Sequence, residues 1–118
     1  MRAIVKCFFS PDIDDLWGFT PADSDCFGFL LQIIVGPENE CGEESFDVVV
    51  VTPKWLQSQH RVGDIVIGRH YLIVFEYNFQ KIAEFISSFV SRCYGKDWDE
   101  IANKIGRLGR WEFEDYQP

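Results

Sequence analysis

The side chains able to do acid–base or nucleophilic chemistry in this sequence are few and scattered. The two histidines, His60 and His70, are separated by apolar and charged residues, and no two of the four cysteines form a C-x-x-C pair. The sequence contains no G-x-S-x-G, no H-E-x-x-H and no glycine-rich phosphate loop. We therefore predict no enzyme activity, no catalytic residue and no bound cofactor, although a cysteine and a histidine distant in sequence can still meet in space.

A small hydrolase using His70, Glu76 or a cysteine is one alternative. His70 lies inside an apolar stretch, which favours a hydrogen-bonded structural histidine over a general base. Glu76 precedes a predicted helix start, where the helix dipole favours a carboxylate. The scattered spacing of the cysteines favours free, buried or partly buried thiols in a reducing cytosol over a disulfide pair; they are Cys7, Cys26, Cys41 and Cys93.

The run from Asp12 to Asp15 invites comparison with a calcium-binding loop. An EF-hand loop needs ligands at alternate positions and a glycine at the sixth. Here the fifth and sixth positions are Leu16 and Trp17. We predict no metal site.

Acidic residues are concentrated in the first two-fifths of the chain. Residues 1–47 hold ten acidic and two basic side chains and residues 48–118 hold nine of each, so the first part carries the whole net charge of −8. Such a field repels nucleic acid and anionic membranes and attracts cationic partners. An acidic stretch is also commonly no more than a solvated face. Composition alone leaves both interpretations open.

One segment predicts a central strand that leads into a long amphipathic helix. Residues 70–75 are rich in aromatic and β-branched side chains, which favour strands. Asn78 is a suitable N-cap, and the apolar side chains of residues 79–93 recur at three- and four-residue steps, with Phe85 alone outside the stripe. Gly95 suits a left-handed position at the helix end. The other elements are expected to cover the apolar face of this unit.

The remaining pattern predicts an α+β fold with a mainly antiparallel sheet of about five strands and two to three helices packed on it. The second strand is nearly continuous in apolar character and is expected to be central. Thr52 and Pro53 begin a short helix that offers Trp55 and Leu56 to the core. Asp97 and Glu100 form a capping box for a helix that Gly109 closes. The predicted strands are residues 2–9, 27–35, 46–51, 70–75 and 111–114, and the predicted helices are residues 54–60, 79–93 and 98–108.

The length of 118 residues predicts a single domain, residues 1–118. No window approaches the roughly 18 apolar residues that a membrane span needs. The first 15 residues lack the apolar region of a signal peptide, so we expect a cytoplasmic protein.

Five collinear blocks cover most of the chain: SPDIDDL (10–16), FGFLLQIIVGP (27–37), GEESFDVVVVTPKWL (42–56), GRHYLIVFEY (68–77) and GRWEFEDY (109–116). Together they resemble the immunity protein 8 family of bacterial polymorphic toxin and contact-dependent inhibition systems. The resemblance implies a small cytoplasmic protein that binds and neutralises a toxin domain delivered by a neighbouring cell. It implies neither catalysis nor a cofactor, and it does not name the toxin.

The resemblance gives the acidic stretches a partner. A toxin that attacks nucleic acid needs a basic surface for phosphates, and an acidic inhibitor can occupy that surface. We expect a basic cognate toxin domain as partner and neither nucleic acid nor membrane, and the sequence leaves the oligomeric state open. The candidate contacts are Asp12, Asp14, Asp15, Trp17, Asp23 and Asp25 in residues 10–25 (the arm), and Glu38, Glu40, Glu43 and Glu44 in a polar connection. The large apolar side chains of the arm are expected to fix it to the body, with Trp17 partly exposed as an aromatic anchor.

A second alternative is an adaptor domain that binds an endogenous partner by strand addition at the last strand. An apolar, unpaired edge at residues 111–113 would favour it. An immunity protein should instead be encoded beside a toxin domain and purify with it.

Overall fold

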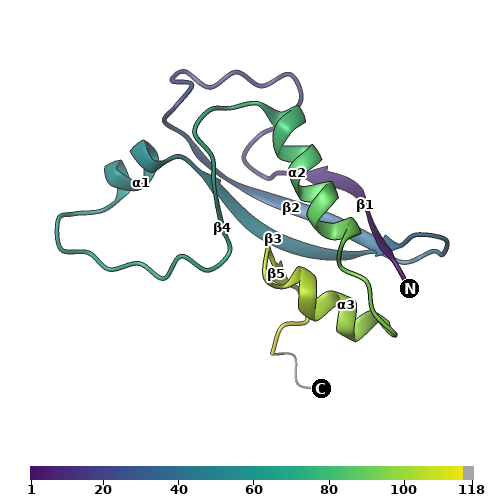
Figure 1. Cartoon of the computed structure of the whole chain (residues 1–118). Helices are drawn as coiled ribbons and strands as arrows, with labels where there is room; N and C mark the ends of the chain where they lie inside the picture. Colours follow the sequence, from purple (N-terminus) through teal and green to yellow (C-terminus); the bar gives the residue numbers. More distant parts are fainter. Residues whose placement is uncertain (116–118) are drawn as a thin grey trace.

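The sheet is built around a long antiparallel hairpin of β2 (Gly28–Pro37) and β3 (Glu44–Val51) (Figure 1). The structure is a computed structural model, and it describes residues 1–115. β1 (Ala3–Phe9) pairs antiparallel with β2. The other edge of β3 is shared by β5 (Arg110–Trp111), antiparallel, and β4 (Tyr71–Ile73), parallel. The predicted α+β fold with a mainly antiparallel sheet is confirmed, and β2 is central as expected.

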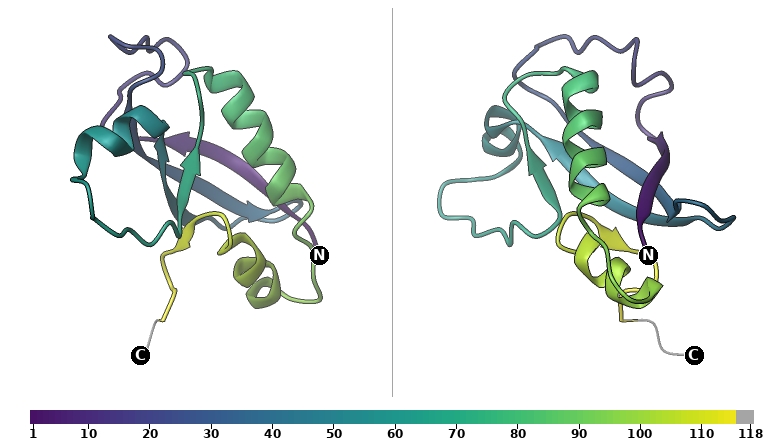
Figure 2. Two further views of the ribbon diagram at one scale, coloured as in Figure 1. Left: turned by 60° about the vertical axis from the view of Figure 1, so that its left-hand side comes forward. Right: turned by 45° about the vertical axis from the view of Figure 1, so that its right-hand side comes forward.

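Helices cover one face of this sheet. α2 (Phe79–Ser91) crosses that face, and α3 (Trp98–Ile105) lies near β5 at the lower end (Figures 1 and 2). Alternate residues of β2 and β3 point toward the helices and are buried, as the two-residue period of a strand requires. The fully buried core side chains include Leu31, Ile33, Phe46, Val48, Ile86, Ile101 and Ile105.

The amphipathic helix is confirmed. Asn78 caps α2 by accepting a hydrogen bond from the Lys81 N–H at 3.1 Å. Phe85 is 53% exposed, as its place outside the stripe predicted. The expected left-handed conformation of Gly95 is wrong, because the C-cap of α2 is Arg92 in the right-handed conformation and Gly95 has no positive φ. The carbons of the Glu100 side chain lie close to Gly95, which explains a glycine there without any turn requirement.

The prediction that residues 70–75 form the central strand is wrong. β4 has three residues, lies at the sheet edge and pairs only with β3. Ile73 and Phe75 are 52% and 75% exposed. β-propensity reports how well a side chain fits a pleated surface, and it does not distinguish a central strand from an edge.

Several boundaries also differ from prediction. β2 continues through Gly36 and Pro37, and β3 starts at Glu44, so the hairpin loop is residues 38–43. No residue of α1 (Pro53–Gln59) is buried, so Trp55 and Leu56 are half-buried and lie outside the main core. α3 ends at Ile105 and not near Gly109, and β5 is shorter than the predicted strand 111–114. Tyr116, in the last of the five blocks, lies outside the described residues.

Within residues 1–115, no helix combines the length and the apolar character that a bilayer crossing demands; α2, with 13 residues, is the longest.

Candidate functional site

The two acidic stretches lie at opposite ends of β2. The arm precedes this ten-residue strand and the hairpin loop follows it, so the strand separates them by about 33 Å. Figure 2 shows the arm above the sheet and the hairpin loop at the far end of the strands. The structure therefore does not bring the nine candidate carboxylates into one surface.

The arm is held to the body by buried side chains and backbone hydrogen bonds. Ile13 and Leu16 are 7% and 6% exposed, as expected for its anchors. The Tyr77 hydroxyl donates to the Leu16 carbonyl, and the Tyr77 N–H donates to the Ser24 carbonyl at 3.2 Å. Burial raises the pKa of Tyr77, so this phenol stays protonated and remains a donor. The arm is an ordered part of the molecule.

Trp17 projects from the arm and is 64% exposed. Its ring meets Phe79, the first residue of α2, edge to face with 4.8 Å between ring centroids. Phe19 makes a similar contact with Tyr77 at 5.2 Å. Trp17 thus packs against the core residue Phe79 while most of its surface faces solvent. This combination suits an aromatic residue that contacts a partner.

Three arm aspartates accept backbone hydrogen bonds. Asp12 accepts from the Leu30 N–H at 2.8 Å, beyond the last residue pair of β1 and β2. Asp15 accepts from the Gly18 N–H at 3.1 Å, and Asp23 from the Asp25 N–H at 3.3 Å. The first bond joins the arm to β2, the other two hold turns within the arm, and all three aspartates remain exposed. Among the described residues Asp14 makes no hydrogen bond, so its carboxylate is available to a partner.

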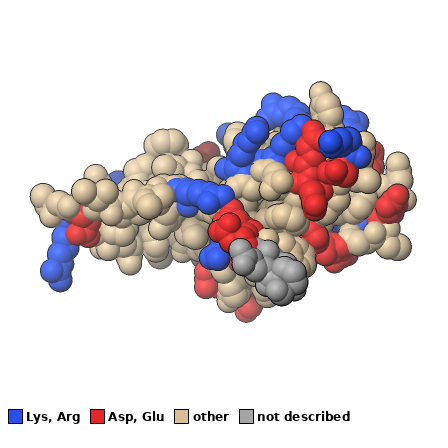
Figure 3. Space-filling model, turned by 90° about the horizontal axis from the view of Figure 1, so that it is seen from below, with Lys and Arg blue, Asp and Glu red and all other residues tan. Residues whose placement is uncertain are grey.

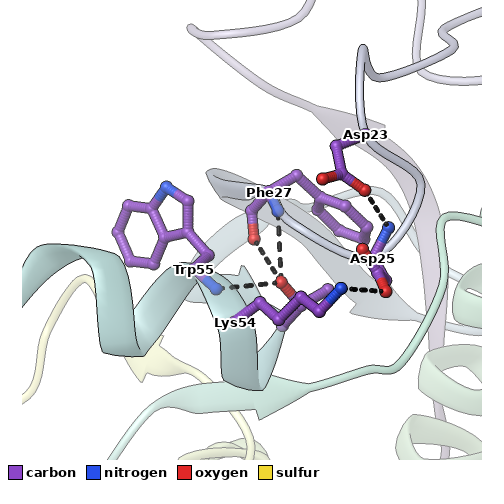
Figure 4. Close-up of polar contacts among 6 residues, drawn as sticks. Asp23, Asp25, Phe27, Lys54 and Trp55 are labelled. Carbon is purple, nitrogen blue, oxygen red and sulfur yellow. Dashed lines mark hydrogen bonds and ion pairs between the residues drawn. The ribbon is translucent and has the colours of Figure 1, made fainter.

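Asp25 is paired within the chain. Its carboxylate lies 2.8 Å from the Lys54 Nζ at the start of α1 (Figure 4). The hydrogen bond from Lys54 lowers the pKa of Asp25 and raises that of Lys54. The adjacent Thr52 hydroxyl oxygen accepts from the N–H groups of Phe27 and Trp55 at 3.1 and 3.3 Å (Figure 4). Asp25 therefore joins the end of the arm to α1 and contributes little free charge.

Glu44, the last of the candidate carboxylates, is structural. One of its oxygens accepts hydrogen bonds from the indole N–H groups of Trp98 and Trp111, the second at 3.0 Å. It thereby joins β3 to α3 and β5. Glu38, Glu40 and Glu43 are exposed in the hairpin loop. No local pattern could have revealed the role of Glu44, since its partners are 54 and 67 residues away.

The groups named for a hydrolase are not gathered in one place. The Nε2 of His70 donates to the Gly106 carbonyl at 2.8 Å, so this histidine has the structural role that its apolar neighbours indicated. Glu76 is exposed and lies 3.9 Å from the Lys81 Nζ. Burial raises the pKa of the Cys93 thiol, which opposes formation of a nucleophilic thiolate. In the described part of the chain, His, Cys, Asp and Glu side chains form no group of three suited to a metal ion.

The last strand offers little edge for an adaptor. Arg110 and Trp111 already pair with β3, and the Trp111 ring stacks on Phe46 with 6.4 Å between centroids. The Glu112 N–H donates to the Ser45 carbonyl at 3.1 Å. All four cysteines are unpaired, so the expectation of free thiols is confirmed. Cys93 is buried and Cys26 is half-buried, as expected, but Cys7 and Cys41 are exposed, so the expected burial is wrong for these two.

The sequence interpretation missed an exposed apolar surface around β4. We call it the apolar end, and it comprises Val62, Ile65, Val66, Ile67, Ile73, Phe75 and Phe85. A hollow of about 580 Å³ lies between β4, α1 and residues 61–68, and a second of about 260 Å³ lies between β4 and α2. Figure 3 shows this projecting part mostly uncharged except for basic and acidic groups near its tip, whereas charged groups of both signs are denser toward the opposite end of the view. Of the residues of the apolar end, only Ile73 and Phe75 belonged to the segment that was predicted as a central strand.

The profile of one protein family, described as Immunity protein 8, matches residues 3–116 of the 118. The chain belongs to the immunity protein 8 family. Neither a curated protein nor a solved structure gives a match. The resemblance drawn from the five sequence blocks is thereby confirmed.

Membership of an immunity protein family implies a toxin-neutralising role that rests on a protein–protein surface and not on a catalytic site. This immunity protein offers three surfaces for a partner: the acidic arm around Trp17, the apolar end, and the smaller acidic hairpin loop.

Proposed function

We propose that this immunity protein neutralises a cognate toxin domain by binding it stoichiometrically, without catalysis, through the arm. The observation that carries the proposal is the exposed Trp17, which packs on Phe79 and is preceded in the arm by the exposed Asp12, Asp14 and Asp15. An arm that carries both an exposed aromatic ring and exposed carboxylates combines a contact of large area with a charge that selects a basic partner.

The fixed conformation of the arm favours tight binding. Ordering a flexible segment on binding costs free energy, and this cost is reduced where the bound conformation already exists. Ile13, Leu16 and the Tyr77 hydrogen bonds hold the arm before any partner arrives. Asp12, Asp15 and Asp23 are likewise held by backbone donors, so their charges are presented at fixed positions.

The arm is a better contact surface than the hairpin loop. Both carry exposed carboxylates, but residues 38–43 contain no aromatic residue, whereas the arm contains Trp17 and Phe19. Aromatic side chains commonly supply most of the binding free energy of an interface, and charges at its rim mainly accelerate association.

The expected partner is a toxin domain with a basic surface, and a nuclease fits this description because it must hold phosphates. Opposite charges also speed the encounter between the two proteins. Rapid capture serves an antidote, since free toxin acts on the cell until it is bound. We place this encounter in the bacterial cytoplasm.

The test is binding to the toxin domain encoded beside this gene, by pull-down and then by association kinetics and calorimetry at low and high salt. The arm variant is Asp14→Asn, Asp15→Asn and Asp23→Asn, and the matched control is Glu38→Gln, Glu40→Gln and Glu43→Gln. Each removes three charges, and the asparagines keep the carbonyl acceptors of the arm turns. We expect the arm variant to slow association by about tenfold at low salt and to flatten its salt dependence. The control should change the rate much less.

Trp17→Ala is the second variant, and we expect it to raise Kd by about 30-fold or more. A slower rate only in the hairpin-loop variant would move the interface to the other end of β2. Tight binding that is indifferent to salt and to both triple variants would move it to the apolar end. Absence of binding to any neighbouring gene product would overturn the immunity role.

A further inference from the structure

The apolar end has few contacts with the rest of its own chain. Val62, Ile65 and Ile67 are 107%, 96% and 84% exposed. A side chain added at Gly63 or Gly68 would meet no atom within 4 Å, which shows that residues 61–68 project from the body. Val62, Val66 and Ile73 line the first hollow, and Ile73, Phe75 and Phe85 line the second, so these five side chains form a continuous apolar surface. Monomeric proteins rarely expose a contiguous apolar patch unless a partner covers it.

β4 adds a backbone edge beside which no other strand of the described residues lies, although the Tyr71 N–H donates to the Gly68 carbonyl at 3.2 Å. On its inner side, the His70 carbonyl accepts from the Val49 N–H at 3.0 Å, and the Val74 N–H donates to the Val51 carbonyl at 2.9 Å. Because successive residues of a strand direct their backbone groups to alternate sides, Ile73 directs its N–H and C=O away from β3. An edge of this kind is a template for another strand.

We propose that the apolar end is the contact surface between two copies of this immunity protein, paired antiparallel through their β4 edges. A two-fold axis at Ile73 brings the two Ile73 residues opposite each other, so that each N–H can donate to the carbonyl of the other. The pairing is confined to β4 itself, because Phe75 lies in a bend beyond its end. The partner's strand lies beside the hollow of about 580 Å³ that Tyr71 and Ile73 line.

The exposed area is close to what a stable dimer requires. Each of the seven side chains of the apolar end is at least 43% exposed. At on the order of 100 Å² apiece they offer about 700 Å², against roughly 800 Å² per partner in a standard interface.

The distribution of charge favours a second copy over the basic toxin at this surface. The charged groups nearest the apolar end are balanced, with Arg61 and Lys81 against Asp64 and Glu76. Two copies with a net charge of −8 each can therefore meet here without opposing like charges, and the acidic arms stay outside the contact. A basic partner would gain no electrostatic attraction here.

The test is the mass of the purified full chain without toxin, by sedimentation velocity across a concentration series. We expect a reversible dimer of twice 13.7 kDa. Val62→Asp and Ile65→Asp should each raise the Kd of the dimer by about tenfold or more. Both wild-type side chains are almost completely exposed, so neither substitution disturbs folding. Ile73→Asp tests the strand edge. Phe9→Asp is the matched control, because Phe9 is 54% exposed on β1 and Ile73 52% exposed on β4.

A wild-type chain that stays monomeric at every concentration would overturn the proposal. If that monomer also lost toxin affinity on Val62→Asp or Ile65→Asp, the toxin would be the true occupant of the surface. A dimer that survives Val62→Asp, Ile65→Asp and Ile73→Asp would place the contact elsewhere and equally overturn it. Because the mass is measured without toxin, this result stands apart from the outcome of the toxin-binding test.

Discussion

The arm and the projecting segment 61–68 are both irregular connections that carry large apolar side chains, yet they differ in where those side chains go. In the arm, Ile13 and Leu16 are buried; in the segment, Val62, Ile65 and Ile67 face solvent. The difference follows their hydrogen bonds. The arm is bonded to β2 and to Tyr77, whereas Arg61 and Asp64 bond to each other across a local turn.

Anchoring to the body therefore decides whether an apolar side chain in a connection stabilises the fold or remains available to a partner. In the arm the apolar groups hold the loop and the acidic groups are displayed. In the segment the apolar groups themselves are displayed. One surface suits a basic partner and the other an apolar one.

The largest expected difference between the two regions is in stability. Leu16→Ala removes a buried side chain and should lower the free energy of unfolding by about 2–4 kcal/mol. Ile65→Ala removes an exposed one and should change it by no more than about 0.5 kcal/mol. Urea denaturation of both variants measures the contrast. Equal effects would show that the two connections are anchored alike.

A smaller effect should separate two aspartates of the arm itself. Asp12→Ala leaves the Leu30 N–H without its acceptor and should cost about 1 kcal/mol. Asp14→Ala removes no hydrogen bond within the chain and should be neutral within about 0.5 kcal/mol. Hydrogen exchange at the Leu30 amide gives a local measure, and faster exchange is expected only in the Asp12 variant. Identical exchange in both would contradict the role of Asp12.

The smallest effect concerns the ion pair of Asp25 with Lys54. The Asp25 pKa is lowered in the folded protein from an ordinary value of 3.8. The ion pair therefore contributes fully to the free energy of unfolding above that pH, and this contribution is lost as the pH falls through the folded pKa. Both groups are solvent-exposed, so the contribution is small. The urea midpoints of wild type and Asp25→Asn should differ slightly near neutral pH and converge in acid. A difference that persists unchanged in acid would have another cause.

The sequence predicts those features of the fold that depend on neighbouring residues. The caps at Asn78 and Asp97, the apolar stripe of α2 and the exposure of Phe85 were all predictable, since each depends on residues within one or two helical turns. The β2–β3 hairpin and the order of the elements followed from alternating apolar runs and turn residues.

Features that depend on distant contacts were not predictable. The composition of residues 70–75 fits a strand at the centre of a sheet as well as one at its edge. The position of β4 is decided by how β4 and β5 are placed along β3, which the local sequence does not show. The acidic candidates could be named by composition, but the pairing of Asp25 with Lys54 and of Glu44 with two tryptophans could not. Their separation at the two ends of β2 also became visible only in the fold.

The contacts of Glu44 with Trp98 and Trp111 have a consequence for synthesis on the ribosome. β1 to β3 are complete once Val51 has been added, but α3 and β5, which Glu44 holds in place, begin 47 or more residues later. At about 5–20 residues per second, the apolar side of the nascent sheet stays uncovered for roughly several seconds. Translation speed across residues 52–97 therefore sets how long chaperones or neighbouring nascent chains have access to Phe46 and Val48.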